Sequence, residues 1–132
     1  MRFMVLVKAD EQAGAPGEEQ VRALTRYTKD LVRAGVLLAA DGLTSSADGT
    51  RVCFADGRAT VVDGPFEGAL VTGYWVLDVG SKQEALEWVR RCPRVGTGEF
   101  ELRQVAEPAE APGPELREHE DYLRAQIGAR RT

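Results

Sequence analysis

Apolar runs and amphipathic segments alternate along the first forty residues. Residues 3–7 form the run FMVLV, which is too short for a helix and partly β-branched, so it predicts a strand. Helical spacing of the apolar positions then predicts a helix over residues 18–35, ended by Gly35. The predicted buried stripe of this helix consists of Val21, Leu24, Thr28 and Leu31, with Tyr27 beside it. Residues 36–40, VLLAA, predict a second strand.

The middle of the chain predicts a β-hairpin. The segments RVCF and ATVV flank Asp56 and Gly57, a pair that favours the two-residue turn in which both residues have positive φ. The hairpin therefore stands between the second predicted strand and the rest of the chain.

The second half repeats the order strand, helix, strand. Gly73–Val79 predicts a strand, and Ser81 with Glu84 forms a capping box that begins a helix, which Pro93 ends. The predicted stripe of this helix is Ala85, Leu86, Val89 and Cys92. Phe100–Val105 alternates apolar and polar residues as a last strand. The order predicts an α+β protein with a ferredoxin-like βαβ-hairpin-βαβ sandwich.

The apolar content of the strands predicts a dimer. Three of the predicted strands are apolar at consecutive positions, so both faces of the sheet require burial. Two helices cover only one face. A second copy of the chain, related by a two-fold axis, would cover the other, and we therefore expect a homodimer whose sheets close on each other.

Composition changes after residue 106. Residues 107–132 begin with a linker rich in Pro, Ala and Glu and continue with a weakly amphipathic helix over Pro114–Ile127, whereas residues 1–106 form the main domain. The helix stripe consists of Leu116, His119 or Glu120, Leu123 and Ile127. Two interpretations are open: the helix docks on its own or the partner subunit, or it is a frayed tail.

Charge and composition exclude several classes of partner. The chain has 132 residues, 43% of them hydrophobic, and a net charge of −4 with scattered Lys and Arg, so we expect neither nucleic acid nor an anionic membrane as a partner. The amino-terminal apolar run is too short for a signal peptide or a membrane span, which favours a cytoplasmic protein. Cys53 and Cys92 have no metal-ligand spacing and predict two buried free thiols. No metal site and no cofactor motif is recognised.

The stretch VVDGPF contains the first candidate site residue. Asp63 cannot take the usual turn hydrogen bond from the residue two positions on, because Pro65 has no N–H. Its carboxylate must bond to the Phe66 N–H, find a more distant donor, or remain available to a ligand. We expect Phe66 to anchor the chain in the core. A rigid corner and a catalytic carboxylate are both consistent with this pattern.

The candidates for ligand binding are five residues, and they are Phe66, Tyr74, Trp75, Lys8 and Asp41. Tyr74 and Trp75 occupy adjacent strand positions, so they face opposite sides of the sheet and only one can line a cavity between subunits. Lys8 shares a face with Met4 and Leu6; it is either an inward partner for Asp63 or a solvated strand end.

The remaining candidates have simpler interpretations. Asp41 closes the second strand before Gly42 and serves as a ligand-binding residue or as a turn residue. His119, the only histidine, is expected to be a solvated residue of the tail helix.

The spaced motifs resemble a known family. MRFMVLV, VLLAADGL, VVDGPF, GYWVLDV, SKQEALEWVRRCP and FELRQV together resemble the DGPF branch of the YCII-related proteins over about Met1 to Val105. The resemblance implies a small bacterial protein of the dimeric α+β barrel type. It also implies an occurrence near extracytoplasmic-function sigma factors.

The sequence departs from better-understood YCII-like relatives at their acid/base pair. Those relatives use a histidine on the first helix and an aspartate before a proline after the second. Here the corresponding segments read RALTRYTK and RCPR, so the histidine is missing and Cys92 precedes Pro93. The pair is therefore not transferred to this chain.

Three functions are compatible with these patterns. The leading hypothesis is a homodimer that binds a small molecule. The first alternative is a cofactor-free isomerase, hydrolase or monooxygenase with Asp63 as the acid/base group and Tyr74 assisting. The second alternative is an accessory regulator that works with a sigma factor through its tail helix.

Overall fold

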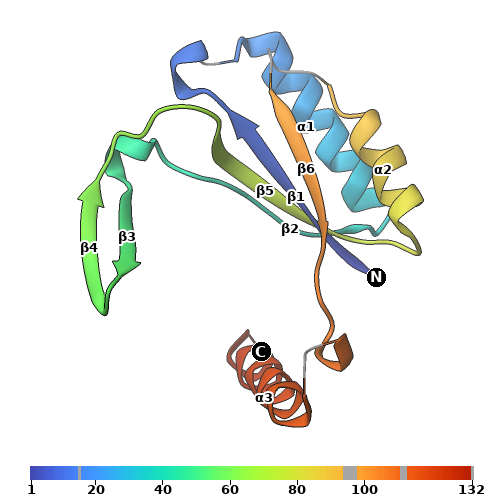
Figure 1. Cartoon of the computed structure of the whole chain (residues 1–132). Helices are drawn as coiled ribbons and strands as arrows, with labels where there is room; N and C mark the ends of the chain where they lie inside the picture. Colours follow the sequence, from blue (N-terminus) through green and yellow to red (C-terminus); the bar gives the residue numbers. More distant parts are fainter. Residues whose placement is uncertain (15, 94–97, 111–112, 132) are drawn as a thin grey trace.

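The computed structural model describes residues 1–14, 16–93, 98–110 and 113–131, which form a four-stranded sheet, a two-stranded hairpin and three α-helices (Figure 1). The strands are β1 (Arg2–Ala9), β2 (Leu37–Gly42), β3 (Thr50–Ala55), β4 (Arg58–Asp63), β5 (Leu70–Asp78) and β6 (Glu99–Gln104). The helices are α1 (Glu18–Arg33), α2 (Lys82–Arg90) and α3 (Pro114–Arg131), and short 3-10 turns are η1 (Glu11–Ala13), η2 (Ser46–Asp48) and η3 (Pro108–Glu110).

The main sheet has the strand order β2-β5-β1-β6, and each neighbouring pair is antiparallel. This is the arrangement of two interleaved βαβ units with the hairpin inserted between them, which confirms the ferredoxin-like α+β fold. Helices α1 and α2 lie on the same side of the sheet (Figure 1). We call the side turned away from these two helices the open face.

The core lies between the sheet and the two helices. Phe3, Val5 and Leu77 are fully buried there, together with Leu31 of α1. The sequence placed Val21 in the buried stripe of α1, but Val21 is exposed and Tyr27 is buried instead. Tyr27 takes this place because its ring contacts Trp75 and its hydroxyl donates to the backbone oxygen of Trp88, a bond that ties α1 to α2.

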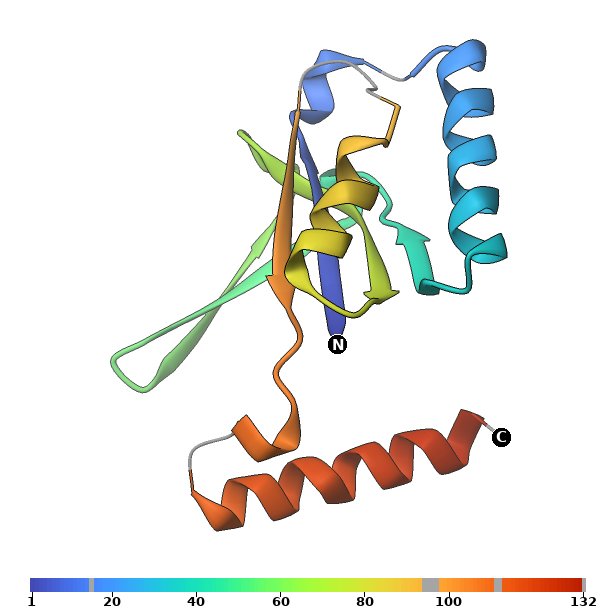
Figure 2. The ribbon, with the colours of Figure 1, turned by 90° about the vertical axis from the view of Figure 1, so that its right-hand side faces the viewer.

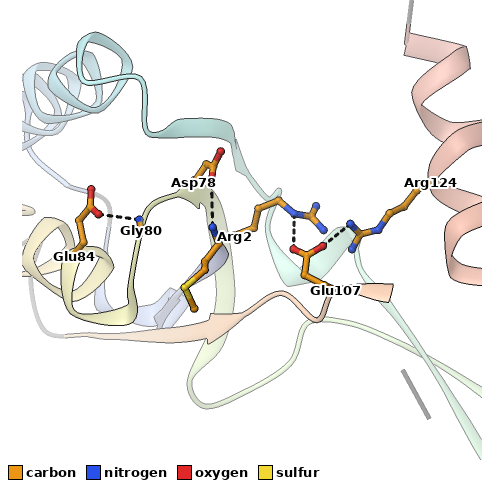
Figure 3. A network of polar contacts seen from close by, with 7 residues as sticks. Arg2, Asp78, Gly80, Glu84, Glu107 and Arg124 are labelled. Atoms are coloured by element: carbon orange, nitrogen blue, oxygen red, sulfur yellow. Dashed lines mark hydrogen bonds and ion pairs between the residues drawn. The ribbon is translucent and has the colours of Figure 1, made fainter. Parts of the chain in front are cut away.

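The predicted capping box at α2 forms with one difference. The Ser81 hydroxyl accepts from the Glu84 N–H at 3.1 Å, as expected for an N-cap. The Glu84 carboxylate accepts from the N–H of Gly80 rather than from that of Ser81 (Figure 3). Both contacts satisfy backbone donors at the start of the helix.

The hairpin stands apart from the main sheet. Asp56 and Gly57 have φ values of 50° and 72°, which confirms the predicted two-residue turn. All residues of β3 and β4 are exposed. The prediction of two buried thiols is therefore wrong for Cys53, which is exposed, and confirmed for Cys92. The error arises because apolar alternation identifies a strand but does not show whether that strand joins the main sheet.

Helix α3 follows the sheet through η3 and lies apart from it (Figure 2). Residues 111 and 112 of the predicted linker lie outside the described residues. Glu107 holds the base of the extension: one carboxylate oxygen lies 2.8 Å from Nη1 of Arg124 in α3, and the other lies 3.5 Å from Nε of Arg2 in β1 (Figure 3). The apolar residues of α3 remain exposed, and they are Leu116, Tyr122, Leu123 and Ile127.

Among the described residues, no helix is long and apolar enough to cross a membrane.

Candidate functional site

The open face of the sheet carries both apolar and charged side chains. Alternation along the paired strands assigns to it, among others, Met4, Leu6, Lys8, Ala39, Asp41, Tyr74, Val76, Glu99, Glu101 and Arg103. The apolar members lie mainly on the central strands β1 and β5, and they are half-buried in the single chain. Of the charged members, Asp41, Glu99, Glu101 and Arg103 lie on the edge strands β2 and β6, and Lys8 lies near the end of β1.

Four of these residues form one row across the sheet. Asp41 of β2 is opposite Tyr74 of β5, Tyr74 is opposite Leu6 of β1, and Leu6 is opposite Glu101 of β6. Because neighbouring strands are about 4.8 Å apart, the two acidic residues at the ends of the row are separated by roughly 14 Å. The row therefore has a carboxylate at each end, with Tyr74 and the apolar Leu6 between them.

Tyr74 and Asp41 form the first polar pair. The phenol hydroxyl of Tyr74 donates to Oδ2 of Asp41 at 2.7 Å. The two residues meet because the pairing of β2 with β5 shifts between Leu37 and Ala39, and this irregularity sets the register that places Asp41 opposite Tyr74. A phenol next to a carboxylate combines a donor and an acceptor that a polar ligand could share.

Lys8 and Glu101 form the second polar pair. Nζ of Lys8 lies 2.9 Å from Glu101 and 3.7 Å from Glu99. The hydrogen bond and the charge of Glu101 raise the pKa of Lys8 above its ordinary value of 10.5. In return, the hydrogen bond from Lys8, helped by Arg103, lowers the pKa of Glu101 below 4.5. Both groups therefore stay ionised at neutral pH.

Trp75 lies on the other side of the sheet from Tyr74. It is buried among the core residues, with its ring centre 5.7 Å from that of Tyr27 and 5.7 Å from that of Phe100. Of the two neighbouring aromatic residues, Tyr74 is therefore the one on the open face.

Asp63 ends β4 and takes part in the hairpin rather than in the row. Its Oδ1 accepts from the hydroxyl of Thr50 at 2.9 Å, so it uses a more distant donor than the turn itself supplies. The phenol next to a carboxylate is thus Tyr74 with Asp41, and the cation of Lys8 pairs with Glu101.

The segment after Asp63 is held in a compact group of contacts that we call the hairpin neck, formed by Glu11, Ser46, Gly49, Gly64 and Phe66. The Phe66 N–H donates to the hydroxyl of Ser46 at 2.9 Å, and the Ser46 N–H donates to Glu11 at 2.8 Å. The Gly64 N–H donates to the Gly49 oxygen at 2.9 Å. A Cβ on Gly64 would lie 1.7 Å from the backbone oxygen of Ser46, so only glycine fits there.

The ring of Phe66 is used within the hairpin neck. The guanidinium of Arg51 lies 3.9 Å from the ring centre, in the geometry of a cation–π contact. Phe66 is half-buried rather than part of the main core. The DGPF stretch therefore fixes how the hairpin leaves the body of the protein.

Glu101 of the second polar pair and Ser46 of the hairpin neck were not identified from the sequence. Alternation in FELRQV places Glu101 on the side opposite Phe100 and Leu102, so the pattern could have identified it as a neighbour of Lys8. Ser46 has no such signal, because its contacts depend on the fold bringing η1, η2 and the DGPF stretch together. His119 lies exposed on α3. In the described part of the chain, His, Cys, Asp and Glu side chains form no group suited to a metal ion.

The described part of the chain also has hollows away from the open face. One, of about 450 Å³, surrounds the hairpin turn at Asp56 and Gly57. Another, of about 510 Å³, lies between α1 and α2 and is lined in part by Arg26, Tyr27 and Arg91. The open face is one surface of the sheet, so a closed cavity forms there only when a second layer of protein packs against it.

The fold and the row define a protein with a ferredoxin-like α+β sheet whose open face carries the candidate site. The family model of the YCII-related domain matches residues 1–108, and the chain belongs to this family. Comparison with curated proteins found no match to the chain.

Proposed function

We propose that this protein is a homodimer that binds a small molecule on the open face of its sheet, between two subunits. The observation that carries the proposal is the cross-sheet row, in which Tyr74 hydrogen-bonds to Asp41 at one end and Glu101 pairs with Lys8 at the other. Ligand sites combine a mainly apolar lining with a few well-placed polar groups, and the open face has this composition.

The distribution of the helices supports the dimer. Helices α1 and α2 cover one side of the sheet, and Met4, Leu6 and Val76 remain on the other side. Burying these side chains against a second sheet stabilises an assembly by about 25 cal/mol for each Å² of apolar area. The same contact would enclose the polar pairs and strengthen their interaction with a ligand, because water is excluded.

The polar pairs indicate what kind of ligand the site would hold. Tyr74 and Asp41 offer a hydrogen-bond donor and an acceptor, and Lys8 offers a cation that is already balanced by acidic neighbours. A small molecule with an apolar body and at least one hydrogen-bonding group would satisfy both the apolar centre of the row and its polar ends.

Native mass spectrometry of the protein purified from its own source tests this proposal. We expect a dimer that carries a small-molecule adduct, and we expect Tyr74→Phe and Lys8→Met to lower its occupancy. Arg26→Met, in the hollow between α1 and α2, is the matched control and should retain the adduct. A dimer without any adduct, or an adduct lost only in the control, would contradict the proposed site.

A cofactor-free enzyme is the second candidate function. The specific observation in its favour is the phenol–carboxylate pair, since a carboxylate and a phenol can exchange a proton with a bound substrate. In this proposal the acid/base group is Asp41 rather than Asp63, because Asp41 is the carboxylate beside Tyr74. Turnover of a co-purified molecule that survives Asp63→Asn but is lost in Asp41→Asn would support it.

An accessory role beside a sigma factor is a third proposal, and it uses the exposed apolar residues of α3. Leu116, Leu123 and Ile127 are available for a partner in the single chain. Deletion of residues 107–132 should remove such a partner and leave the dimer intact. Loss of the dimer in the same deletion would instead place α3 at the subunit interface.

A further inference from the structure

We infer that the β3–β4 hairpin is an interaction arm that packs on the second copy of this chain and supplies a large part of the dimer interface. This inference rests on the proposed function, because it takes the homodimer as given. We call the hairpin, Thr50 to Asp63, the arm. It is fixed to the body by the hairpin neck and is otherwise exposed along both strands.

Toward the tip of the arm one side is apolar, whereas Thr50 and Asp63 occupy the same side at its base. The strand pairing places Val52 opposite Val61 and Phe54 opposite Ala59, so these four side chains share one side. Phe54 is 80% exposed and Val61 is 64% exposed. The other side is mixed, since it carries Arg51, Cys53, Arg58 and Thr60 together with Ala55 and Val62. A two-stranded hairpin with such a side is marginal in water unless another surface covers it.

The arm is built to hold a direction. Gly64 is packed against Ser46 so closely that a methyl group would not fit, and Phe66 is held both by its N–H and by Arg51. A freely moving loop does not need so many close contacts at its base. They orient the apolar side of the arm relative to the sheet.

The direction of the arm favours a second copy as its partner. The arm projects from the side of the sheet opposite α1 and α2, which is the side on which the proposed partner subunit lies (Figure 1). In a two-fold dimer each arm reaches the other subunit, so the contact is made twice.

The area that a stable dimer needs also favours this partner. The four strands have eight, six, nine and six residues, so the open face has a flat area of about 460 Å², whereas a standard interface buries about 800 Å² on each partner. Because an aromatic residue covers roughly 150–250 Å², Phe54 alone could supply on the order of 150 Å² of the difference. The two valines of the apolar side add to this area.

The charge of the arm argues against a membrane as the partner. Arg51 and Arg58 are balanced within the arm by Asp56 and Asp63, so the arm has no net positive charge to attract anionic lipids. The apolar side therefore fits a protein surface, and the second copy is the one that the fold places within reach.

Sedimentation equilibrium across the micromolar range tests the inference. We expect the double variant Phe54→Ser with Val61→Thr to raise the dimer dissociation constant about 30-fold or more, since both arms lose their anchors. The matched control is Cys53→Ser with Thr60→Ala on the other side of the same strands, and its dissociation constant should equal that of the wild type. Near-ultraviolet circular dichroism of the Tyr27–Trp75 pair verifies that each variant is folded.

The possible outcomes separate the two proposals. A dimeric wild type with an equally dimeric arm variant overturns the arm inference and leaves the proposed dimer in place. A wild type with the mass of one chain overturns both. A second test replaces Phe54 with a photo-crosslinking phenylalanine analogue and mixes isotopically light and heavy chains. We expect cross-linked products that contain one light and one heavy chain. Cross-links confined to one chain, or formed only with a different protein or with lipid, would overturn the second copy as partner.

Discussion

The phenol oxygen of Tyr74 lies 2.7 Å from Oδ2 of Asp41, although the two residues are 33 positions apart and belong to different strands. This contact is the most direct link between the fold and the proposed site. It depends on strand register, so it also reports whether the edge strand β2 is correctly placed against β5.

A double-mutant cycle on Tyr74→Phe and Asp41→Asn should give a coupling free energy of about 0.5–1 kcal/mol, because the hydrogen bond is partly solvated. The measurement is chemical denaturation of the wild type, both single variants and the double variant. If the two substitutions change the free energy of unfolding additively, the contact does not contribute to stability.

The Lys8–Glu101 pair should make stability depend on pH at both extremes. Lys8 has a raised pKa, so its contribution is complete below pH 10.5 and is lost as the pH rises through its higher folded-state pKa. Glu101 has a lowered pKa, so its contribution is complete above pH 4.5 and is lost as the pH falls through its lower folded-state pKa.

The stability difference between the wild type and Glu101→Gln should therefore be constant between these limits and shrink outside them. Unfolding by denaturant at a series of pH values measures it. Glu99→Gln is the control and should show a smaller difference, since Glu99 lies farther from Lys8. A difference that persists unchanged at pH 3 would contradict the assignment.

Gly64→Ala should lower the free energy of unfolding by about 3 kcal/mol or more, because the new methyl group would overlap the backbone oxygen of Ser46. Gly42→Ala is the matched control, as a Cβ there meets no atom within 4 Å. Thermal unfolding and amide exchange at Phe66 measure both effects. Equal stability of the two variants would show that the hairpin neck is looser than described.

Glu107→Gln should make the amides of α3 exchange a few-fold faster, because the hydrogen bond with Arg124 becomes weaker. The hydrogen bond from Arg124 lowers the pKa of Glu107 below 4.5, so the link is complete above pH 4.5 and is lost as the pH falls through the lower folded-state pKa. Hydrogen exchange with mass spectrometry measures the protection of residues 114–131. Glu110→Gln on the same turn should leave the exchange unchanged, and an effect as large as that of Glu107→Gln would contradict a specific link.

Local patterns predicted most of the fold. The turn at Asp56 and Gly57, the cap at Ser81 and the order of the strands and helices follow from residues close together in the sequence, and the structure confirms them. The exposure of Cys53 could not be predicted, because it depends on where the hairpin lies relative to the sheet.

The candidate site was predicted in part. Tyr74, Lys8 and Asp41 were identified as chemically suitable residues, but their partners depend on register across four strands. The irregularity in β2 that brings Asp41 opposite Tyr74 has no clear sequence signal. The alternation of β6 did contain the signal for Glu101, and combining it with the strand order would have placed Glu101 near Lys8.

The central claim is that the open face is the surface where two subunits meet around the polar row. Isotope-filtered NMR on a mixture of labelled and unlabelled chains tests it most directly, through contacts between methyl groups of different subunits. We expect such contacts at the methyl groups of Met4, Leu6 and Val76, which lie on the open face. Contacts confined to Ala23 and its surroundings between α1 and α2, or a protein with the mass of one chain, would contradict the claim.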